Sequence, residues 1–266
     1  MSIISLLTDF GVDDEYVGVM KGVILSINPA AVLVDISHRV EPQGILQAAY
    51  LIKSTYRFFP EKTIHVIVVD PGVGSDRAIL VYEKEKHIFI APDNGVLTLL
   101  LDETGDDNVI RIENSDYFLK PVSQTFHGRD IFAPVAAYLS RGTVIAEFGP
   151  SLDQREIIRL PVPSAYITEA GTIVGSVISI DHFGNLITNI DLDMLKKYDI
   201  AEKEAVITLG EVTLKGIMSS YISVETGHPL VIKGSRGYLE IAVNKGSAQA
   251  KLNVTIGDTV RIGIDN

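Results

Sequence analysis

Short apolar runs alternate with amphipathic segments through the first half of the chain. Apolar runs typical of buried strands lie at residues 3–8, 32–36, 63–69, 78–82 and 87–91. Apolar side chains recur at helical spacing in residues 15–27, 45–56 and 130–140. Asp13 or Asp14 is the expected N-cap of the first of these helices, and Gly142 follows the last. Strands separated by helices predict an α/β fold with a mostly parallel sheet covered by helices.

The pattern changes in the second half of the chain, from Gly171 onward. Closely spaced strand-like runs occupy residues 172–180, 186–190, 205–209, 229–233, 238–243 and 259–264. Turn-forming residues separate them, as in a small antiparallel β-barrel or sandwich. Prolines between residues 150 and 163 mark the change. We therefore expect an α/β domain over residues 1–155 and a smaller, antiparallel β-barrel-like domain over residues 165–266.

Composition narrows the functional classes. Apolar residues make up 46% of the 266 residues, which is enough for two cores, and the net charge of −11 argues against broad contact with a nucleic-acid backbone. The absence of cysteine excludes thiolate metal sites and a cysteine nucleophile, and it fits a reducing compartment. The first residues read as a strand rather than a signal peptide, and no apolar run reaches membrane-spanning length. We expect a cytoplasmic protein without nucleic-acid or membrane partners.

The richest candidate chemistry follows the strand at residues 63–69. Asp70 stands where that strand becomes a loop rich in glycine, and Arg77, seven positions later, can fold back to meet it. His127 precedes the helix at residues 130–140 and adds an imidazole. Together these side chains could hold and polarise a water molecule. A structural ion pair that braces the loop is the alternative. A metal site using Asp70, His127 and Asp130 is less favoured, because the HxH, HxxxH and HExxH spacings are missing.

Further polar residues suit a nucleoside ligand. Asp9 ends the first strand, where a carboxylate can accept both hydroxyls of a ribose, although it could instead cap the following turn. Asn185 offers a donor and an acceptor to a purine edge, and Asp181 could accept from an ammonium group; an ordinary β-turn is the alternative for both. Ser235 and Arg236 bring a hydroxyl and a cation before a strand, or merely form a turn.

Taken together, these stretches are similar to the S-adenosyl-L-methionine (SAM) hydrolases that form adenosine, also called SAM hydroxide adenosyltransferases. Their superfamily includes the SAM-dependent chlorinases and fluorinases. The matching stretches run from end to end: residues 8–11 (TDFG), 16–22 (YVGVMKG), 34–38 (VDISH), 69–77 (VDPGVGSDR), 91–95 (APDNG), 125–130 (TFHGRD), 180–189 (IDHFGNLITN) and 234–242 (GSRGYLEIA). So many ordered matches make the resemblance specific.

The resemblance implies a homotrimer that holds SAM between the first domain of one subunit and the second domain of its neighbour. SAM would be the substrate, with no metal or cofactor. The implied water-activating residues are Asp70, Arg77 and His127. The implied substrate-binding residues are Asp9 for the ribose hydroxyls, Asn185, Tyr221 and the backbone from Val243 to Lys245 for adenine, and Asp14, Asp181, Ser235 and Arg236 for the methionine end.

Elementary electrostatics favours water over a halide as the nucleophile. An aspartate ~4 Å from a halide would repel it by about 4 kcal/mol at an effective dielectric constant of ~20, before Arg77 offsets part of this. Water meets no such repulsion at Asp70, and Gly128 supplies no hydroxyl for a halide. We therefore expect hydrolysis of SAM to adenosine and L-methionine. The alternatives are a SAM-dependent chlorinase and a non-catalytic SAM or adenosine sensor. A phosphatase is not favoured, because the sequence contains no P-loop motif.

Overall fold

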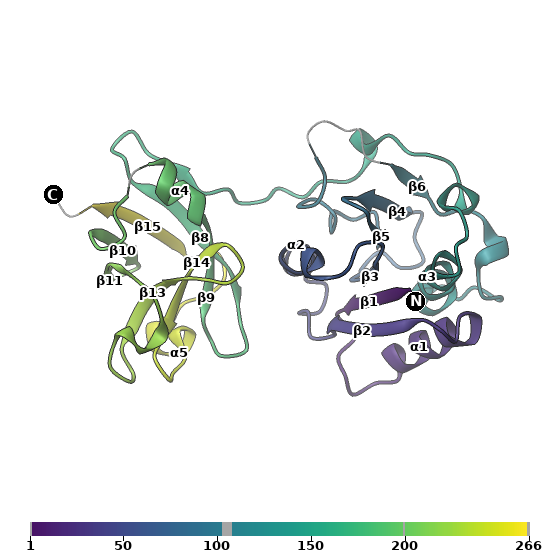
Figure 1. Ribbon diagram of the computed structural model, residues 1–266, viewed down its shortest axis with the longest axis horizontal. Coiled ribbons are helices and arrows are strands. Elements are labelled where there is room, and N and C mark those ends of the chain that lie inside the picture. Colours follow the sequence, from purple (N-terminus) through teal and green to yellow (C-terminus); the bar gives the residue numbers. More distant parts are fainter. Residues whose placement is uncertain (1, 103–107, 199, 265–266) are drawn as a thin grey trace. The chain divides into compact units, whose positions relative to one another are not determined.

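The computed structural model describes residues 2–102, 108–198 and 200–264. The chain divides into two compact units, one ending at Pro161 and the other beginning at Val162. Each unit has its own hydrophobic core residues, on both faces of the sheet in the first unit. Figure 1 shows the helices and strands of each unit.

The first unit is built on a mixed, mostly parallel sheet. Its strands are β1 (Ile3–Thr8), β2 (Val32–Ser37), β3 (Ile64–Val68), β4 (Ile79–Lys84), β5 (His87–Pro92) and β6 (Val109–Arg111). They lie in the order β2-β1-β3-β5-β4-β6. The pairs β1–β2, β1–β3 and β3–β5 are parallel, whereas β4 pairs antiparallel with β5 and β6. The predicted parallel sheet is therefore confirmed, with an antiparallel edge.

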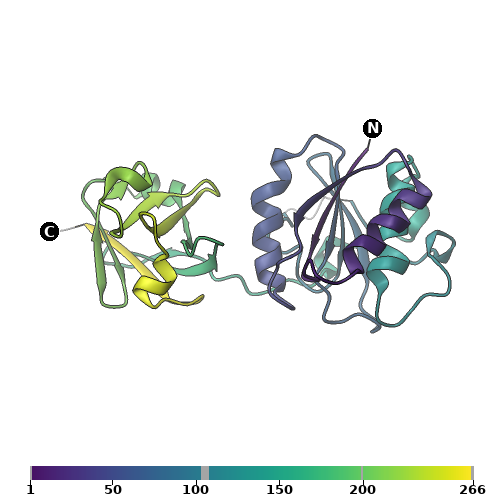
Figure 2. The same cartoon turned by 90° about the horizontal axis from the view of Figure 1, so that it is seen from below.

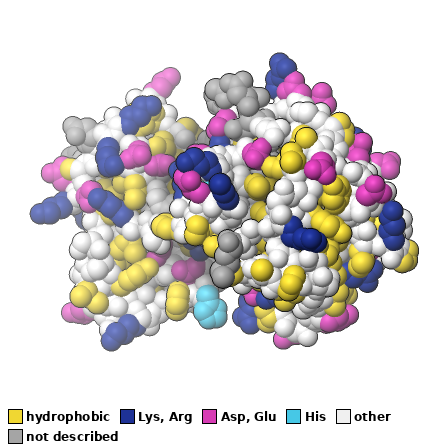
Figure 3. Space-filling view, turned by 45° about the vertical axis from the view of Figure 1, so that its right-hand side comes forward, with side chains coloured by type: hydrophobic (Ala, Val, Ile, Leu, Met, Phe, Trp, Pro, Cys, Tyr) yellow, Lys and Arg dark blue, Asp and Glu magenta, His cyan; other side chains and the backbone are white. Residues whose placement is uncertain are grey.

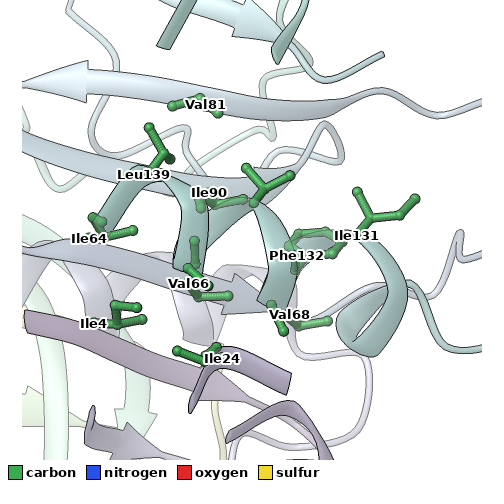
Figure 4. Close-up of a cluster of buried hydrophobic side chains, with 14 of the residues drawn as sticks. Ile4, Ile24, Ile64, Val66, Val68, Val81, Ile90, Ile131, Phe132 and Leu139 are labelled. Atoms are coloured by element: carbon green, nitrogen blue, oxygen red, sulfur yellow. The ribbon is translucent and has the colours of Figure 1, made fainter. Parts of the chain in front are cut away.

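Helices cover both faces of this sheet. Helices α1 (Tyr16–Ile27) and α3 (Ala133–Ser140) lie on one face, and α2 (Ile45–Thr55) lies on the other (Figures 1 and 2). Successive strand residues point to opposite faces, so Val66 and Val68 join the core under α1 and α3 while Ile67 joins the core under α2. Figure 4 shows the first of these cores, in which Phe132 packs among strand side chains. The sheet is thus buried on both faces, as continuous apolar strands predict.

The first helix begins differently from our expectation. Neither Asp13 nor Asp14 caps it: the N-cap is Glu15, which has helical dihedral angles and makes no capping hydrogen bond through its side chain. An aspartate cap requires an extended backbone at the N-cap, and Glu15 does not provide one. Asp14 is exposed in the turn before the helix.

The helix predicted at residues 130–140 also starts earlier, with a wide π-type turn over Gly128–Phe132. Pro134 explains the widening. It has no N–H to donate to the carbonyl of Asp130, four residues earlier, and that carbonyl accepts from the backbone N–H of Leu119 at 2.8 Å instead. The regular helix α3 therefore begins at Ala133, and His127 stands at the N-terminal end of the wide turn.

The second unit is a curved, mostly antiparallel sheet. Its strands are β7 (Tyr166–Ile167), β8 (Ile173–Ile180), β9 (Leu186–Asp191), β10 (Ala205–Leu209), β11 (Val212–Lys215), β12 (Ile217–Met218), β13 (Pro229–Lys233), β14 (Tyr238–Val243) and β15 (Thr259–Ile264). The order is β11-β10-β15-β8-β9-β14-β13-β12, with β7 beside β8. Strand β11 at one end approaches β13 near the other, so the sheet nearly closes, as expected for a β-barrel-like domain. Only the pairing of β12 with β13 among the described strand pairs of this sheet is parallel.

Short helices complete both units. They are α4 (Leu192–Lys197) and α5 (Ala248–Leu252), together with the 3₁₀ turns η1 (Tyr56–Phe58), η2 (Ser115–Tyr117), η4 (Ile145–Phe148), η5 (Gln154–Glu156) and η6 (Tyr221–Ser223). Of the helices in the described ranges, none is long and apolar enough to cross a membrane. On the face shown in Figure 3, Lys and Arg side chains are intermixed with Asp and Glu rather than gathered into one basic patch.

Candidate active site

Asp70 and Arg77 form a buried, bidentate ion pair beyond the carboxyl end of strand β3. Asp70 lies just beyond β3 and Arg77 just before β4. The Arg77 Nε donates to Asp70 Oδ1 at 2.7 Å, and Nη2 donates to Oδ2. The side chains are only 4% and 8% exposed, respectively. Two parallel N–H···O bonds fix the carboxylate in orientation as well as position. The sequence-based expectation that Arg77 folds back onto Asp70 is confirmed.

His127 joins the same cluster through Arg77. Its Nδ1 lies 3.0 Å from Arg77 Nη2. A guanidinium can only donate, so Nδ1 must be the acceptor, and we assign the remaining proton of the neutral ring to Nε2. Burial lowers the pKa of His127, and the positive charge of Arg77 lowers it further, against smaller opposing effects of the Asp70 and Asp130 carboxylates and of a backbone hydrogen bond to Ser123. The ring therefore stays neutral at neutral pH and presents an N–H donor at Nε2.

Close contact between two loops brings these three side chains together. Gly74, in the Asp70–Arg77 loop, has φ of +79°, and a Cβ there would lie 2.3 Å from the carbonyl oxygen of Gln124. Only glycine allows this approach, which places the loop against the segment that leads to His127. Hydrogen bonds from Val73 N to Asp70 O and from Ser75 N to Gly72 O keep the loop compact.

Asp130 supports the site without joining it. Its fully buried carboxylate forms an ion pair with Arg129 and accepts from the backbone N–H of Ser123 at 2.8 Å. Those bonds brace the loop before His127 and occupy the oxygens that a metal would need. In the described part of the chain, no three His, Asp or Glu side chains gather in a way that could hold a metal ion.

Asp9 lies at the carboxyl end of β1, half-buried. Its Oδ2 accepts from the backbone N–H of Gln43 at 2.8 Å. The Asp9 loop is also tied to the end of β2, because Gly11 N donates to His38 O at 2.8 Å and the Thr8 hydroxyl lies 2.9 Å from His38 Nδ1. The carboxylate is thus held in place by backbone rather than by a charge, which suits a group that accepts hydroxyl protons.

A separate pocket of about 470 Å³ opens in the second unit. Its walls are Phe183, Asn185, Tyr221, Val243, Lys245 and Gly246. The sequence-based interpretation named Asn185, Tyr221, Val243 and Lys245, and the structure brings these four together. Phe183 and Gly246 were missed. Two aromatic rings, a buried amide and a tight backbone turn are the features that hold a flat heterocycle.

The turn that carries Asn185 is organised by Asp181. Oδ1 of Asp181 accepts from the backbone N–H groups of Phe183 and Asn185, each at 2.9 Å, and Oδ2 accepts from Asn185 Nδ2 at 2.9 Å. Asp181 thus forms the turn that we considered as the alternative. Of the roughly four lone-pair sites on its carboxylate, three are used within the described residues, so at most one remains for a ligand.

This turn is pressed against the start of α5. Gly184 has φ of +81°, and a Cβ there would lie 2.0 Å from the hydroxyl oxygen of Ser247. Ser247 caps α5 by accepting from Ala250 N, and Gln249 N donates back to Gly184 O at 2.9 Å. The start of α5 therefore fixes the position of the turn that carries Phe183 and Asn185 into the pocket.

Ser235 and Arg236 lie in the turn between β13 and β14. The structure adds a residue that the sequence reading missed, Glu240 in β14, whose buried carboxylate accepts from the Tyr221 hydroxyl at 2.6 Å. A glutamate between Leu239 and Ile241 was a signal that could have been used. Likewise Phe183, 73% exposed within an Asp/Gly/Asn turn, is a large aromatic side chain with no core to fill.

Comparison with known proteins gives a match in each of the two units. The family model described as "SAM hydroxide adenosyltransferase N-terminal domain" matches residues 4–149, and the corresponding C-terminal domain model matches residues 175–261. The chain belongs to the SAM hydroxide adenosyltransferase family. An (R)-S-adenosyl-L-methionine hydrolase of Salinispora arenicola is 34% identical, with 97% of each chain covered. A fluorinase of an Actinoplanes species is 29% identical over 98% of this chain and 97% of its own.

A solved structure extends the comparison to three dimensions. A conserved uncharacterized protein from Thermotoga maritima superimposes with a TM-score of 0.91 at 39% identity, covering 97% of this chain and 99% of its own. The likeness spans both units of this chain, so the family membership rests on the whole length of the chain rather than on one motif.

Proposed function

We propose that this protein hydrolyses S-adenosyl-L-methionine to adenosine and L-methionine by attack of a water molecule on the ribose C5′. The observation that carries this proposal is the Asp70–Arg77–His127 cluster, a buried carboxylate locked in place beside a neutral imidazole. Membership of the SAM hydroxide adenosyltransferase family and the similarity to named hydrolases support it.

The chemistry needs an aligned and polarised water. The water oxygen forms a bond to C5′ while the C5′–sulfur bond breaks, and its electron pair returns to sulfur. Methionine then leaves as a neutral thioether. Asp70 accepts the proton that the water loses, and the Nε2–H of His127 can donate to the water oxygen and fix its direction. Arg77 holds both side chains in place and compensates the charge of Asp70. The water must lie opposite sulfur at near-attack distance.

The remaining predicted residues divide between the parts of the substrate. We assign adenine to the pocket of the second unit and the ribose hydroxyls to Asp9. Asp14, Asp181, Ser235 and Arg236 are assigned to the methionine end. For Asp181 this role is narrow, because most of its carboxylate serves the turn. We further propose that the protein acts in the cytoplasm as a homotrimer, with each SAM shared between the first domain of one subunit and the second domain of its neighbour.

Halide transfer is the closest alternative, since fluorinases are among the relatives. Two features of this chain favour water. A halide would face the Asp70 carboxylate, a repulsion of about 4 kcal/mol at ~4 Å and an effective dielectric constant of ~20. The buried Gly128 offers no hydroxyl to replace the hydration of a halide.

Replacing Asp70 tests the proposal at its centre. Asp70→Asn keeps the size of the side chain and an acceptor for Arg77 but removes the base. We expect kcat for SAM hydrolysis to fall by roughly 10²–10⁴, the usual contribution of a general base. Adenosine affinity, measured by calorimetry, should stay within about twofold, because the adenine pocket lies in the second unit. Unchanged kcat would contradict the assigned base.

A further inference from the structure

Glu240 carries a carboxylate that is largely buried from solvent. It lies in β14, between β9 and β13, opposite Ile187 on one side and Ile232 on the other. The residue is only 8% exposed, and burial raises the pKa of its carboxyl group. Burying a carboxylate costs free energy unless hydrogen bonds or charges compensate. An apolar side chain at this strand position would avoid the free-energy cost of burying a carboxylate, so the presence of a glutamate requires another explanation.

The contacts of Glu240 supply that explanation. Its Oε1 accepts a short hydrogen bond from the Tyr221 hydroxyl, at 2.6 Å. Burial and the nearby Glu240 raise the pKa of Tyr221, so the phenol stays protonated and keeps donating. A Cβ on Gly234 would lie 3.2 Å from Oε2, so the turn before Ser235 and Arg236 also closes over Glu240. The carboxylate thus lies between the Tyr221 segment and that turn.

Tyr221 is the reason this contact bears on function. Its ring lines the pocket, yet the residue is 42% exposed and sits in the short turn η6, where a side chain packed on one side could adopt several rotamers. The bond to Glu240 selects one of them. A ligand that stacks on the ring then finds the wall already in place, and the ordering cost is not subtracted from its affinity.

We propose that Glu240 is a positioning residue that holds the Tyr221 ring as a preformed wall of the adenine pocket, and that it thereby sets the affinity for the adenosine part of the substrate. The inference rests on the proposed function, because it takes adenine as the occupant of the pocket. It goes further by naming a residue that does not line the pocket.

The acceptor, rather than the charge, is the operative part of Glu240. Beyond burial and the Tyr221 hydrogen bond, the negative charge of Asp181 raises the pKa of Glu240 and the positive charge of Arg236 lowers it. Glutamine keeps an oxygen acceptor for the Tyr221 hydroxyl and removes the charge. Leucine has similar bulk and removes both. The two substitutions therefore separate positioning through the hydrogen bond from an electrostatic effect on the ligand.

Adenosine titration calorimetry on the full-length protein tests this inference. We expect Glu240→Leu and Tyr221→Phe each to weaken adenosine binding about three- to tenfold, as loss of one preorganised side chain predicts. Glu240→Gln should stay within about twofold of the parent protein. The double variant should be no weaker than either single variant, because both substitutions remove one interaction. With SAM, KM should rise for Glu240→Leu while kcat changes less than twofold, since the water-activating cluster lies in the first unit.

Tyr117→Phe is a matched control. It also removes a hydrogen bond from tyrosine to glutamate, Glu147, but in the first unit. Adenosine affinity should not respond to it. If Glu240→Leu does not fold, Tyr221→Phe alone decides the matter, because it deletes one hydroxyl from a half-exposed residue. Native affinity in Tyr221→Phe, additive losses in the double variant, or a Glu240→Gln as weak as Glu240→Leu would overturn the inference. Adenosine binding that follows the predicted order in a protein unable to hydrolyse SAM would uphold the inference and refute only the proposed function.

Discussion

At the scale of single residues, the protonation state of His127 sets the acid limit of the proposed reaction. The neutral ring accepts from Arg77 through Nδ1. Protonation would replace that acceptor with a second donor facing a guanidinium, so the contact would become repulsive. The pKa of His127 is lowered by burial and then by Arg77, so the neutral form persists below the ordinary value of 6.5.

The pH profile of kcat therefore has a predicted sign. Activity should be full at neutral pH and fall as the pH drops through the folded-state pKa of His127, which lies below 6.5. His127→Asn places an amide near Arg77 and cannot titrate. The part of the acid limb that His127 contributes should then vanish, leaving a lower but flatter profile. An acid limb that is unchanged in His127→Asn would contradict this role. So would a parent protein in which the His127-dependent fall in kcat is centred above pH 6.5.

The sequence predicted which reactive residues would meet, but not all that they do. Asp70, Arg77 and His127 come together because glycines in one loop signal close backbone approach, and such a signal is local. For Asp181 the sequence offered contact with an ammonium group or a β-turn, and in the structure most of its carboxylate oxygens accept hydrogen bonds from its own turn. Short side chains near their own backbone serve either purpose, and sequence alone does not rank the two.

At the scale of elements, the turn at residues 181–185 and helix α5 together support the pocket that we propose for adenine. Gly184 is the contact point, with φ of +81° and no room for a Cβ against Ser247. Gly184→Ala should destabilise the fold by about 1–3 kcal/mol, from backbone strain and overpacking together, and should weaken adenosine binding. Thermal unfolding and calorimetry measure the two effects.

Gly210 provides a matched control for this substitution. It also has positive φ, +58°, but a Cβ there would meet nothing within 4 Å. Gly210→Ala should cost only the backbone strain, about 1 kcal/mol, and leave adenosine affinity intact. Equal losses of affinity in the two alanine variants would show that the contact with Ser247 does not position the pocket.

Elements with strong local patterns were predicted well, and those decided by distant contacts were not. The bounds of β10, β13, β14 and β15 match the predicted runs, because short runs rich in apolar residues between turn signals define them. The start of the helix after His127 was missed because Pro134 diverts the carbonyl of Asp130 to Leu119, a partner outside the helix. Glu240 was missed because its partner, Tyr221, is 19 residues away in sequence and reaches it only once the sheet has formed.

At the scale of the whole molecule, the predicted machinery is divided between two units. The Asp70–Arg77–His127 cluster, proposed to activate water, lies in the first unit, and the pocket proposed for adenine lies in the second. If the protein is a trimer whose sites each combine halves from neighbouring subunits, two different inactive variants should complement each other. Asp70→Ala damages one half of the site, and Asn185→Ala damages the other.

Co-expression of these two variants makes a sharp test. With random mixing in a ring of subunits, about a quarter of the sites would contain two intact halves, and SAM hydrolysis should return to roughly that fraction of the parent activity. Each variant alone, purified at the same concentration, is the control. Sites built within one chain would always carry one of the defects, so a mixture as inactive as its components would refute sharing between subunits.

The origin of the oxygen in the product tests the central claim most directly. Purified protein is incubated with SAM in water enriched in heavy oxygen, with and without chloride, and the products are examined by mass spectrometry. We predict methionine and an adenosine that carries the heavy atom in its 5′-hydroxyl, whether or not chloride is present. A 5′-chlorinated nucleoside formed with chloride, an unlabelled 5′-hydroxyl, or SAM that binds and remains intact would each contradict water attack at C5′.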